Sequence, residues 1–151
     1  MLAVPVVERS LRMHVAPARV WPVVGDLRRR PEWDRTTERV TRLSGDGGVG
    51  SRYERVARFG RCRVVLLTVV AELEPGVRVR YDGLSRPLRN RTELELSPDG
   101  DGTLVRLLAW YDLRSVELSA TDFDPERVAA LADEQLAGLA RVVTAPERAS
   151  A

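Results

Sequence analysis

Residues 124 to 143 read DPERVAALADEQLAGLARVV, and this stretch predicts one long amphipathic helix. Asp124 is a good N-cap residue, and Pro125 suits the first helical turn. The apolar residues that follow recur every three or four positions, which is the spacing of a single helix face. They are Val128, Leu131, Ala132, Leu136, Leu139, Ala140 and Val143. We therefore expect the chain to end in a helix with one buried face.

The chain before this helix is divided by frequent turn residues into short segments. Gly, Pro, Ser and Asp cluster at residues 44–48, 60, 75–76, 85–87 and 97–102. The strands expected between these turns occupy residues 37–43, 51–59, 62–74, 77–83, 88–97 and 103–114. In the last two, apolar and polar side chains alternate, as in a half-buried strand. Short strands separated by turns predict an antiparallel meander.

The N-terminal part adds one strand and two short helices. Residues 6–15 alternate, and one side of this strand is apolar. That side carries Val7, Leu11, Met13 and Val15. Pro17 then suits the start of a helix that should run to about Gly25, and a second short helix should follow from Leu27 towards Trp33.

This order of elements predicts an α+β fold in which a curved, seven-stranded antiparallel sheet wraps around the long C-terminal helix. A sheet with one apolar face needs a cover of comparable area, and a single helix covers only part of it. Aromatic residues make up only 5% of the chain, which favours an internal cavity of a few hundred cubic ångströms over a filled gap. We expect residues 1–151 to form one domain, with its core in residues 6–143 and loosely held termini.

The charge pattern argues against a nucleic-acid partner. Every basic residue is an arginine, and 24 basic side chains are interleaved with 22 acidic ones, which leaves a net charge of +2. The run Arg28-Arg29-Arg30 lies between Asp26 and Glu32 and is too short to form a phosphate-binding patch. We expect most arginines to lie in solvent.

The remaining composition argues against metals, disulfides and membranes. Cys62 and His14 are each the only residue of their kind, so neither a disulfide within the chain nor a zinc cluster can form. No apolar stretch approaches the ~20 residues that span a bilayer, and the N-terminus lacks the pattern of a signal peptide. We expect a cytoplasmic protein with no cofactor, no metal and no membrane partner.

Several short motifs occur together along the chain. They are Val7-Glu8-Arg9-Ser10, Ala16-Pro17 followed by Val20-Trp21, Asp26 with Pro31-Glu32-Trp33, Val49-Gly50-Ser51-Arg52, Glu72-Leu73-Glu74-Pro75 and Gly102-Thr103-Leu104-Val105. In this combination, residues 6–143 resemble the SRPBCC superfamily of helix-grip proteins, which includes START-related and birch-pollen-allergen-like domains. The chain looks most like the bacterial polyketide cyclase/dehydrase family. The resemblance implies a cavity for an apolar ligand, but its motifs are structural and transfer no catalytic residue.

Arg55 is the first candidate for contact with a ligand. It shares the more apolar face of the strand 51–59 with Tyr53, Ala57 and Phe59. In an apolar cavity its guanidinium group could hold a carboxylate or an enolate, because its fork of donors stays charged. If this strand lies at an edge, Arg55 reaches solvent instead. Both interpretations stay open.

Further polar side chains share faces with apolar residues on the later strands. In an enzyme, they would orient a polyketide chain and hydrogen-bond the oxygen on which enolate charge develops. In a carrier, they would bind one polar end of the ligand. Trp33 follows Pro31 at a helix edge, where related domains often have the pocket mouth. The predicted ligand-binding residues are Trp33, Tyr53, Arg55, Tyr81, Asn90, Thr92 and Tyr111.

The candidates for catalysis are Arg55, Tyr81, Tyr111 and His14. His14 has an unperturbed pKa near neutrality, which suits a general base. Its alternation, however, places it with Ser10 and Arg12 on the polar side of its strand. Asp34 and Asp112 are possible acids, with no pairing predicted between them.

Trp110 alternates with Arg106 and Asp112 and should lie on the convex face of the sheet. Together with Leu104 and Leu108 it would form an apolar patch of the kind that marks a homodimer contact. A dimeric interaction module is therefore a third, more distant interpretation of the chain.

Two main functions fit these observations. In the first, the protein binds a hydrophobic, aromatic polyketide-like small molecule in an internal cavity and could catalyse its cyclisation, dehydration or aromatisation. In the second, it is a non-catalytic carrier or sensor of a lipid, a quinone or another apolar metabolite. The sequence does not separate the two.

Overall fold

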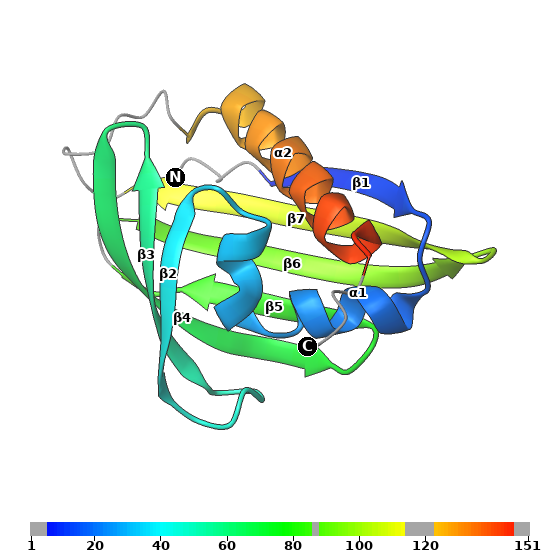
Figure 1. The fold of residues 1–151 in the computed structure, drawn as a ribbon. Coiled ribbons are helices and arrows are strands. Elements are labelled where there is room, and N and C mark those ends of the chain that lie inside the picture. Colours follow the sequence, from blue (N-terminus) through cyan, green and yellow to red (C-terminus); the bar gives the residue numbers. More distant parts are fainter. Residues whose placement is uncertain (1–5, 86–87, 114–122, 147–151) are drawn as a thin grey trace.

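The computed structural model describes residues 6–85, 88–113 and 123–146. Strands, two α-helices and a 3₁₀ helix follow one another within these ranges (Figure 1). In chain order they are β1 (Val7–Met13), α1 (Pro17–Val24), the 3₁₀ helix η1 (Leu27–Glu32), β2 (Thr37–Ser44), β3 (Arg52–Phe59), β4 (Cys62–Glu74), β5 (Arg78–Gly83), β6 (Leu88–Asp99), β7 (Gly102–Leu113) and α2 (Pro125–Thr144). The predicted order and type of the elements are confirmed. The termini predicted to be loose, and part of the turn at 85–87, lie outside the described residues.

The strands form a seven-stranded antiparallel sheet in the order β1-β7-β6-β5-β4-β3-β2. The sheet is strongly curved, and its β2–β4 side rises beside α2 in Figure 1. Register shifts occur between Thr37 and Arg39, between Arg42 and Ser44, and between Val70 and Glu72. Such irregularities bend a strand and increase its twist, which accounts for part of the curvature. The predicted wrapping of the sheet around the helix is therefore observed.

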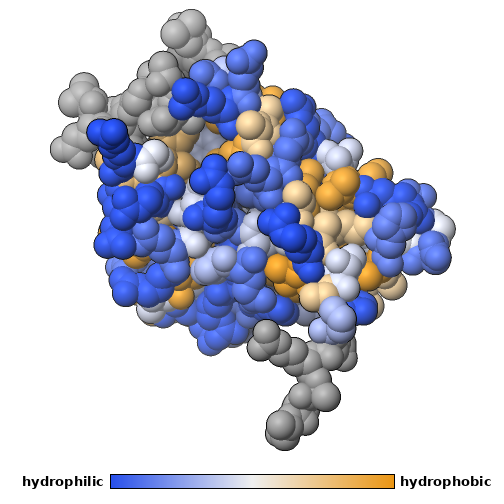
Figure 2. Space-filling model, turned by 45° about the horizontal axis from the view of Figure 1, so that its top comes forward, coloured by the Kyte–Doolittle hydropathy of each residue, from blue (hydrophilic) through white to orange (hydrophobic). Residues whose placement is uncertain are grey.

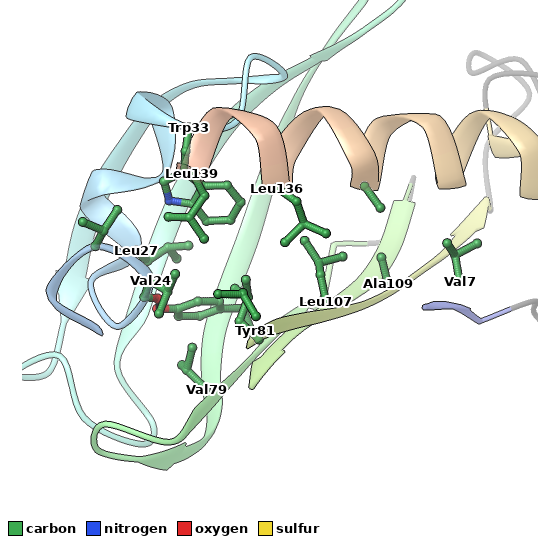
Figure 3. Packing of buried hydrophobic residues seen from close by; sticks show 14 of the residues in the cluster. Val7, Val24, Leu27, Trp33, Val79, Tyr81, Leu107, Ala109, Leu136 and Leu139 are labelled. Carbon is green, nitrogen blue, oxygen red and sulfur yellow. Dashed lines mark hydrogen bonds between the residues drawn. The ribbon is translucent and has the colours of Figure 1, made fainter. Parts of the chain in front are cut away.

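Helix α2 lies across the concave face of the sheet (Figure 1). It begins after Asp124, whose side chain accepts a hydrogen bond from the backbone N–H of Arg127 at 2.9 Å and so satisfies one free helix donor. Leu136 and Leu139 point from α2 towards the sheet (Figure 3) and are buried. The apolar face predicted from the sequence is the face that covers the sheet.

The two short helices pack beside the C-terminal half of α2. The second is a 3₁₀ helix, in which Pro31 provides no backbone N–H. Gly138 allows η1 to approach α2, because a Cβ atom at this position would overlap the backbone carbonyl of Trp33. This close approach packs the chain around Trp33 against α2.

The alternation of the strands is largely reproduced by their burial. Leu94, Val105 and Leu107 are buried on the concave face. Leu11 lies on the predicted apolar side of β1 but is 37% exposed, because β1 is an edge strand. The face in Figure 2 is mostly hydrophilic, and its hydrophobic side chains form small patches. No helix in the described ranges combines the length and apolarity needed to cross a membrane.

Candidate functional site

A row of polar side chains crosses the concave face of the sheet. Cross-strand pairing places Tyr53 of β3 beside Thr68 of β4, and Thr68 beside Gly83 of β5. The same register places Gly83 beside Asn90 of β6, and Asn90 beside Tyr111 of β7. The four polar residues, termed here the polar row, are all buried. Since most of their neighbours on this face are apolar, the row is a polar stripe in an apolar interior.

Two atoms of the polar row have no hydrogen-bond partner among the described residues. They are Oγ1 of Thr68 and Nδ2 of Asn90. Gly83 makes room for the Asn90 amide, because a Cβ atom on Gly83 would overlap it. Buried polar atoms are nearly always hydrogen-bonded to protein or to water. Each of these atoms therefore marks a position that can bind a polar group of another molecule.

Tyr81 and Thr92 form a neighbouring cross-strand pair and already have protein partners. The Tyr81 hydroxyl donates to the backbone carbonyl of Val24 at 2.7 Å, on the side of η1 and α1 (Figure 3). Thr92 Oγ1 accepts from Nη2 of Arg30 at 3.2 Å. Burial raises the pKa of Tyr81 well above its ordinary value, so its hydroxyl stays protonated at neutral pH.

Arg30, Asp34 and Arg55 form a buried ionic cluster, with side-chain exposures of 2%, 0% and 1%. Nε of Arg30 donates to Oδ2 of Asp34 at 2.8 Å. Nη1 of Arg55 lies 3.7 Å from the same oxygen and donates instead to Oγ1 of Thr37 at 3.2 Å. The cluster thus joins η1, the start of β2 and the middle of β3.

The carboxylate of Asp34 is fully occupied by protein donors. Its Oδ1 accepts from N and Oγ1 of Thr36 at 3.0 and 2.7 Å. Its Oδ2 accepts from Arg30 and from Oγ1 of Thr37, the latter at 2.9 Å. Burial by itself raises the pKa of Asp34, but the charges of Arg30 and Arg55 and these hydrogen bonds outweigh burial and lower the pKa below its usual range. Asp34 is therefore an ionised structural group and not the acid that the sequence suggested.

Arg55 has one hydrogen bond and two free donors. Its Nε and Nη2 atoms have no partner in the described part of the chain. Burial, and after it the charge of Arg30, lower the pKa of Arg55 to about 10, so the guanidinium is still charged at neutral pH. Strand β3 lies between β2 and β4, and of the two predicted positions of Arg55 the structure shows the interior one.

Tyr111 connects the polar row to α2 and to two phenylalanine rings. Burial raises the pKa of its hydroxyl, and Gln135 of α2 opposes this shift. The ring centroids of Phe59 and Tyr111 are 5.7 Å apart, and those of Phe59 and Phe123 are 5.1 Å apart. These edge-type contacts join the end of β3 to β7 and to the residue shortly before α2. The curved sheet is held closed at this end by aromatic packing.

Among the open grooves beside α2, two border the residues of the polar interior. The first, between η1 and α2, has a volume of about 320 Å³ and is lined in part by Trp33 and Gln135. The second, between the β3–β4 turn and α2, has a volume of about 400 Å³ and is lined in part by Phe59. Nε1 of Trp33 and Nε2 of Gln135 have no hydrogen-bond partner among the described residues. An ion pair of 2.7 Å between Arg35 and Glu134 borders both grooves.

The residues predicted to bind a ligand all lie in this interior. Buried in the structure are Trp33, Tyr53, Arg55, Tyr81, Asn90, Thr92 and Tyr111. Their contact with a ligand remains a prediction. The structure separates His14 from them: it is exposed, and its Nδ1 accepts from Nη1 of Arg12 at 2.9 Å. Within the described ranges, no group of His, Cys, Asp and Glu could hold a metal ion.

Sequence reasoning missed four polar residues of the interior. Arg30 belongs to a run expected in solvent, although its spacing of four residues from Asp34 indicated a local ion pair. Thr68 lies between Leu66 and Val70 on a buried face, where alternation alone could have found it. Gln135 falls on the apolar stripe of α2, where a polar residue is unusual. Thr37 gave no distinguishing signal.

Trp110 lies on the convex face, as predicted, but it is less exposed than expected. The guanidinium of Arg91 covers its ring at 5.5 Å from the centroid. Trp110 is half-buried as a result, while Leu104 is 38% exposed. The predicted homodimer contact through this face remains a prediction.

Comparison with known families identifies the architecture. Residues 5–144 match the family described as "Polyketide cyclase / dehydrase and lipid transport". The chain belongs to this family. Membership confirms the SRPBCC resemblance and the helix-grip fold. Among curated proteins, none matches this chain.

Solved structures of similar fold include other helix-grip proteins. TTHA0849 from Thermus thermophilus is 21% identical, with a TM-score of 0.77 over 92% of this chain and 97% of that one. The Zhui aromatase/cyclase from Streptomyces sp. R1128 is 15% identical, with a TM-score of 0.72 over 93% and 94%. Ara h 8.0201 is also 15% identical, with a TM-score of 0.68 over 93% and 98%. At these identities, the likeness to each structure concerns the fold alone.

Proposed function

We propose that this protein binds a hydrophobic, aromatic polyketide-like molecule between the concave face of the sheet and α2. The observation that supports this best is the set of unpartnered polar atoms in a largely apolar interior: Nε and Nη2 of Arg55, Nδ2 of Asn90 and Oγ1 of Thr68. Ligand sites typically combine apolar walls with a few well-placed polar groups. A ligand with oxygen atoms spaced along a flat apolar skeleton would fit such an interior.

These groups could also promote a reaction of such a ligand. A polyketide chain that cyclises develops negative charge on a carbonyl oxygen, and fixed donors such as the Arg55 guanidinium and the Asn90 amide would stabilise that charge. The walls would hold the reacting carbons close together. Cyclisation, dehydration or aromatisation would then need no cofactor. The family description and the name of the Zhui aromatase/cyclase agree with this chemistry.

A non-catalytic carrier of an apolar metabolite is the second candidate, and one observation favours it. None of the described interior side chains is suited to accept a proton at neutral pH. Asp34 is occupied by four donors, and burial raises the pKa values of Tyr81 and Tyr111. The interior can bind and polarise a ligand more readily than it can exchange protons with it. The family description also includes lipid transport.

Thermal unfolding with two ligand panels tests the proposal. One panel contains flat polyphenols, and the other contains aliphatic fatty acids and prenylated quinones. A ligand at ~100 times its dissociation constant stabilises the folded state by about 2.7 kcal/mol. For a domain of this size, that raises the melting temperature by roughly 5–11 °C.

Selective stabilisation by polyphenols would support the proposed function, and turnover assays on linear polyketide analogues would then test catalysis. Selective stabilisation by the aliphatic panel would support the carrier instead. Absence of a shift with both panels would refute both ligand classes. Asn90→Leu should weaken the response to polyphenols, since it removes the amide while keeping a similar volume.

A further inference from the structure

Several surface arginines of this protein bind a carboxylate in the same way. Arg28 donates through Nε and Nη2 to the two oxygens of Asp26, both at 3.0 Å. Arg29 donates through the same two atoms to the two carboxylate oxygens of Glu32, at 2.8 and 3.0 Å. Arg91 does the same with Asp82 at 2.9 and 3.3 Å. In these three arginines, the edge formed by Nε and Nη2 holds the carboxylate, as expected for two parallel donors facing two oxygens.

On Arg55 this edge is buried, and no described residue accepts a hydrogen bond from it. Nε and Nη2 are the two atoms of Arg55 without a partner, while Nη1 is hydrogen-bonded to Thr37. Two arginines of the outer face, Arg80 and Arg106, also have an Nε atom without a hydrogen bond among the described residues. The Nε of Arg80 nevertheless lies 3.4 Å from Oδ1 of Asp82 in an ion pair. Both arginines also form ion pairs through their other nitrogens, with Glu72 and Glu8 respectively. The side chain of Arg55 is 1% exposed, so bulk solvent does not supply the missing acceptor as it does at the surface.

The charges of the buried cluster do not balance among the described residues. Arg30 and Arg55 carry two positive charges, and Asp34 carries one negative charge. The four hydrogen bonds to Asp34 leave its carboxylate no capacity to accept from the free edge of Arg55. Tyr111 remains neutral because burial raises its pKa. One buried positive charge is left over, and such a charge is costly unless it is paired.

We infer that the interior of this protein selects a ligand bearing one carboxylate group, bound side-on to Nε and Nη2 of Arg55. A carboxylate supplies both missing features: two coplanar oxygens for the two parallel donors and one negative charge for the cluster. A phenolate, or the enolate of an isolated ketone, has a single oxygen and would satisfy the edge only in part. A phosphate dianion would bring more charge than the cluster has in excess, and it would lie near Asp34.

This inference rests on the proposed function and narrows it to acidic ligands. The acid could have an aromatic body, such as an aromatic polyketide acid, or an aliphatic one, such as a fatty acid. Both share the carboxylate chemistry, and the probes below separate them.

Matched acids and amides test the inference by isothermal titration calorimetry on the full chain at pH 7. The aromatic probes are 2-naphthoate and 2-naphthamide, and the aliphatic probes are decanoate and decanamide. In each pair the body is the same and only the charge and the second oxygen differ. We expect the acid of at least one pair to bind about 10- to 100-fold more tightly than its amide, the range for a charge-assisted hydrogen-bonded pair.

Two variants locate the effect. Arg55→Met should remove the preference for the acid, because the loss of the guanidinium weakens binding of the charged acid much more than binding of the neutral amide. Arg58→Met is the matched control, since Arg58 lies on the same strand but on the exposed outer face, paired with Glu38. It should keep the preference. Without a ligand, Arg55→Met should unfold at or above the temperature of the wild type, because it removes an unpaired buried charge.

The outcomes separate this inference from the proposed function. Equal affinity of the wild type for the acid and the amide would overturn the inference, and this result does not depend on whether the variants fold. Binding of neutral polyphenols without binding of either acid would also overturn it. In both cases the proposed function would stand. If neither acids nor neutral polyphenols bind, both fail. A preference for the acid that survives in Arg55→Met would show that another group holds the carboxylate and would overturn the assignment to Arg55.

Discussion

Replacing Asp34 with asparagine should destabilise the protein strongly, because Asp34 is the carboxylate that lies beside two buried arginines. The asparagine side chain would keep the shape of the aspartate but remove the charge and one acceptor oxygen. The native carboxylate accepts four hydrogen bonds, and it lies 2.8 Å from Nε of Arg30 and 3.7 Å from Nη1 of Arg55. In Asp34→Asn, an amide N–H₂ group would replace one of the two oxygens and would face the donors that this oxygen now accepts from.

The magnitude follows from the burial of the cluster. Removing one partner of a buried ion pair typically costs about 3–5 kcal/mol, since the other charge is left uncompensated. Asp34 and both of its arginine neighbours are 0–2% exposed, so solvent cannot reduce this cost by much. For a domain of this size, the melting temperature should fall by roughly 6–20 °C.

Urea unfolding followed by circular dichroism at pH 7 measures this loss. Glu38→Gln provides a matched control, because Glu38 also contacts two arginines, Arg58 at 3.1 Å and Arg63 at 2.6 Å, but at the surface. This control should lose much less stability, as solvent and salt screen exposed pairs. If Asp34→Asn lowers the free energy of unfolding by less than about 1 kcal/mol, or by no more than Glu38→Gln does, another group neutralises the buried arginines and our charge balance is wrong.

The same interior leads to three further predictions. Since the pKa of Asp34 is lowered on folding, its stabilising contribution is fully present above its unfolded pKa near 3.9 and is lost as the pH falls through the lower folded value. The difference in urea midpoint between the wild type and Asp34→Asn should therefore become smaller below about pH 4. A constant difference down to pH 2 would contradict this prediction. Thr68→Val should leave the free energy of unfolding of the ligand-free protein unchanged or raise it, because Thr68 Oγ1 has no partner among the described residues. Thr103→Val should instead lower the free energy of unfolding by about 1 kcal/mol, because Thr103 Oγ1 donates to a backbone carbonyl at 2.7 Å. Equal losses in both would argue against an unsatisfied hydroxyl at position 68. Gly83→Ala should displace the Asn90 amide and weaken polyphenol binding about fivefold, and calorimetry showing unchanged affinity would remove Asn90 from the site.

The sequence by itself predicted the elements of this fold and the side of each strand that is buried. Alternation and helical spacing are local properties, and each reflects the geometry of a single strand or helix. For this reason Tyr53, Tyr81 and Tyr111 could be placed on the inner face without knowing which strands pair. The same reasoning placed His14 on the polar side of its strand, and in the structure His14 is exposed just after β1 ends.

The position of Arg55 shows where local reasoning stops. Its alternation was clear, but whether it lay inside or reached solvent depended on the place of β3 in the sheet. That place is set by pairing with β2 and β4 and by the curvature of the sheet, and neither is encoded in one strand. Tertiary structure alone showed that Arg55 is buried between two paired strands.

The chemistry of the interior was decided by contacts between distant parts of the chain. Arg30 looked like one of three exposed arginines, yet it reaches Thr92, 62 residues away, because η1 docks against the open face of the sheet. The unpartnered Nε and Nη2 atoms of Arg55 could not be predicted either. They depend on the carboxylate of Asp34 already accepting hydrogen bonds from Thr36, Thr37 and Arg30. Periodicity determines which way a side chain points, whereas hydrogen-bond saturation and charge balance are sums over all neighbours in space, and only the folded chain specifies those neighbours.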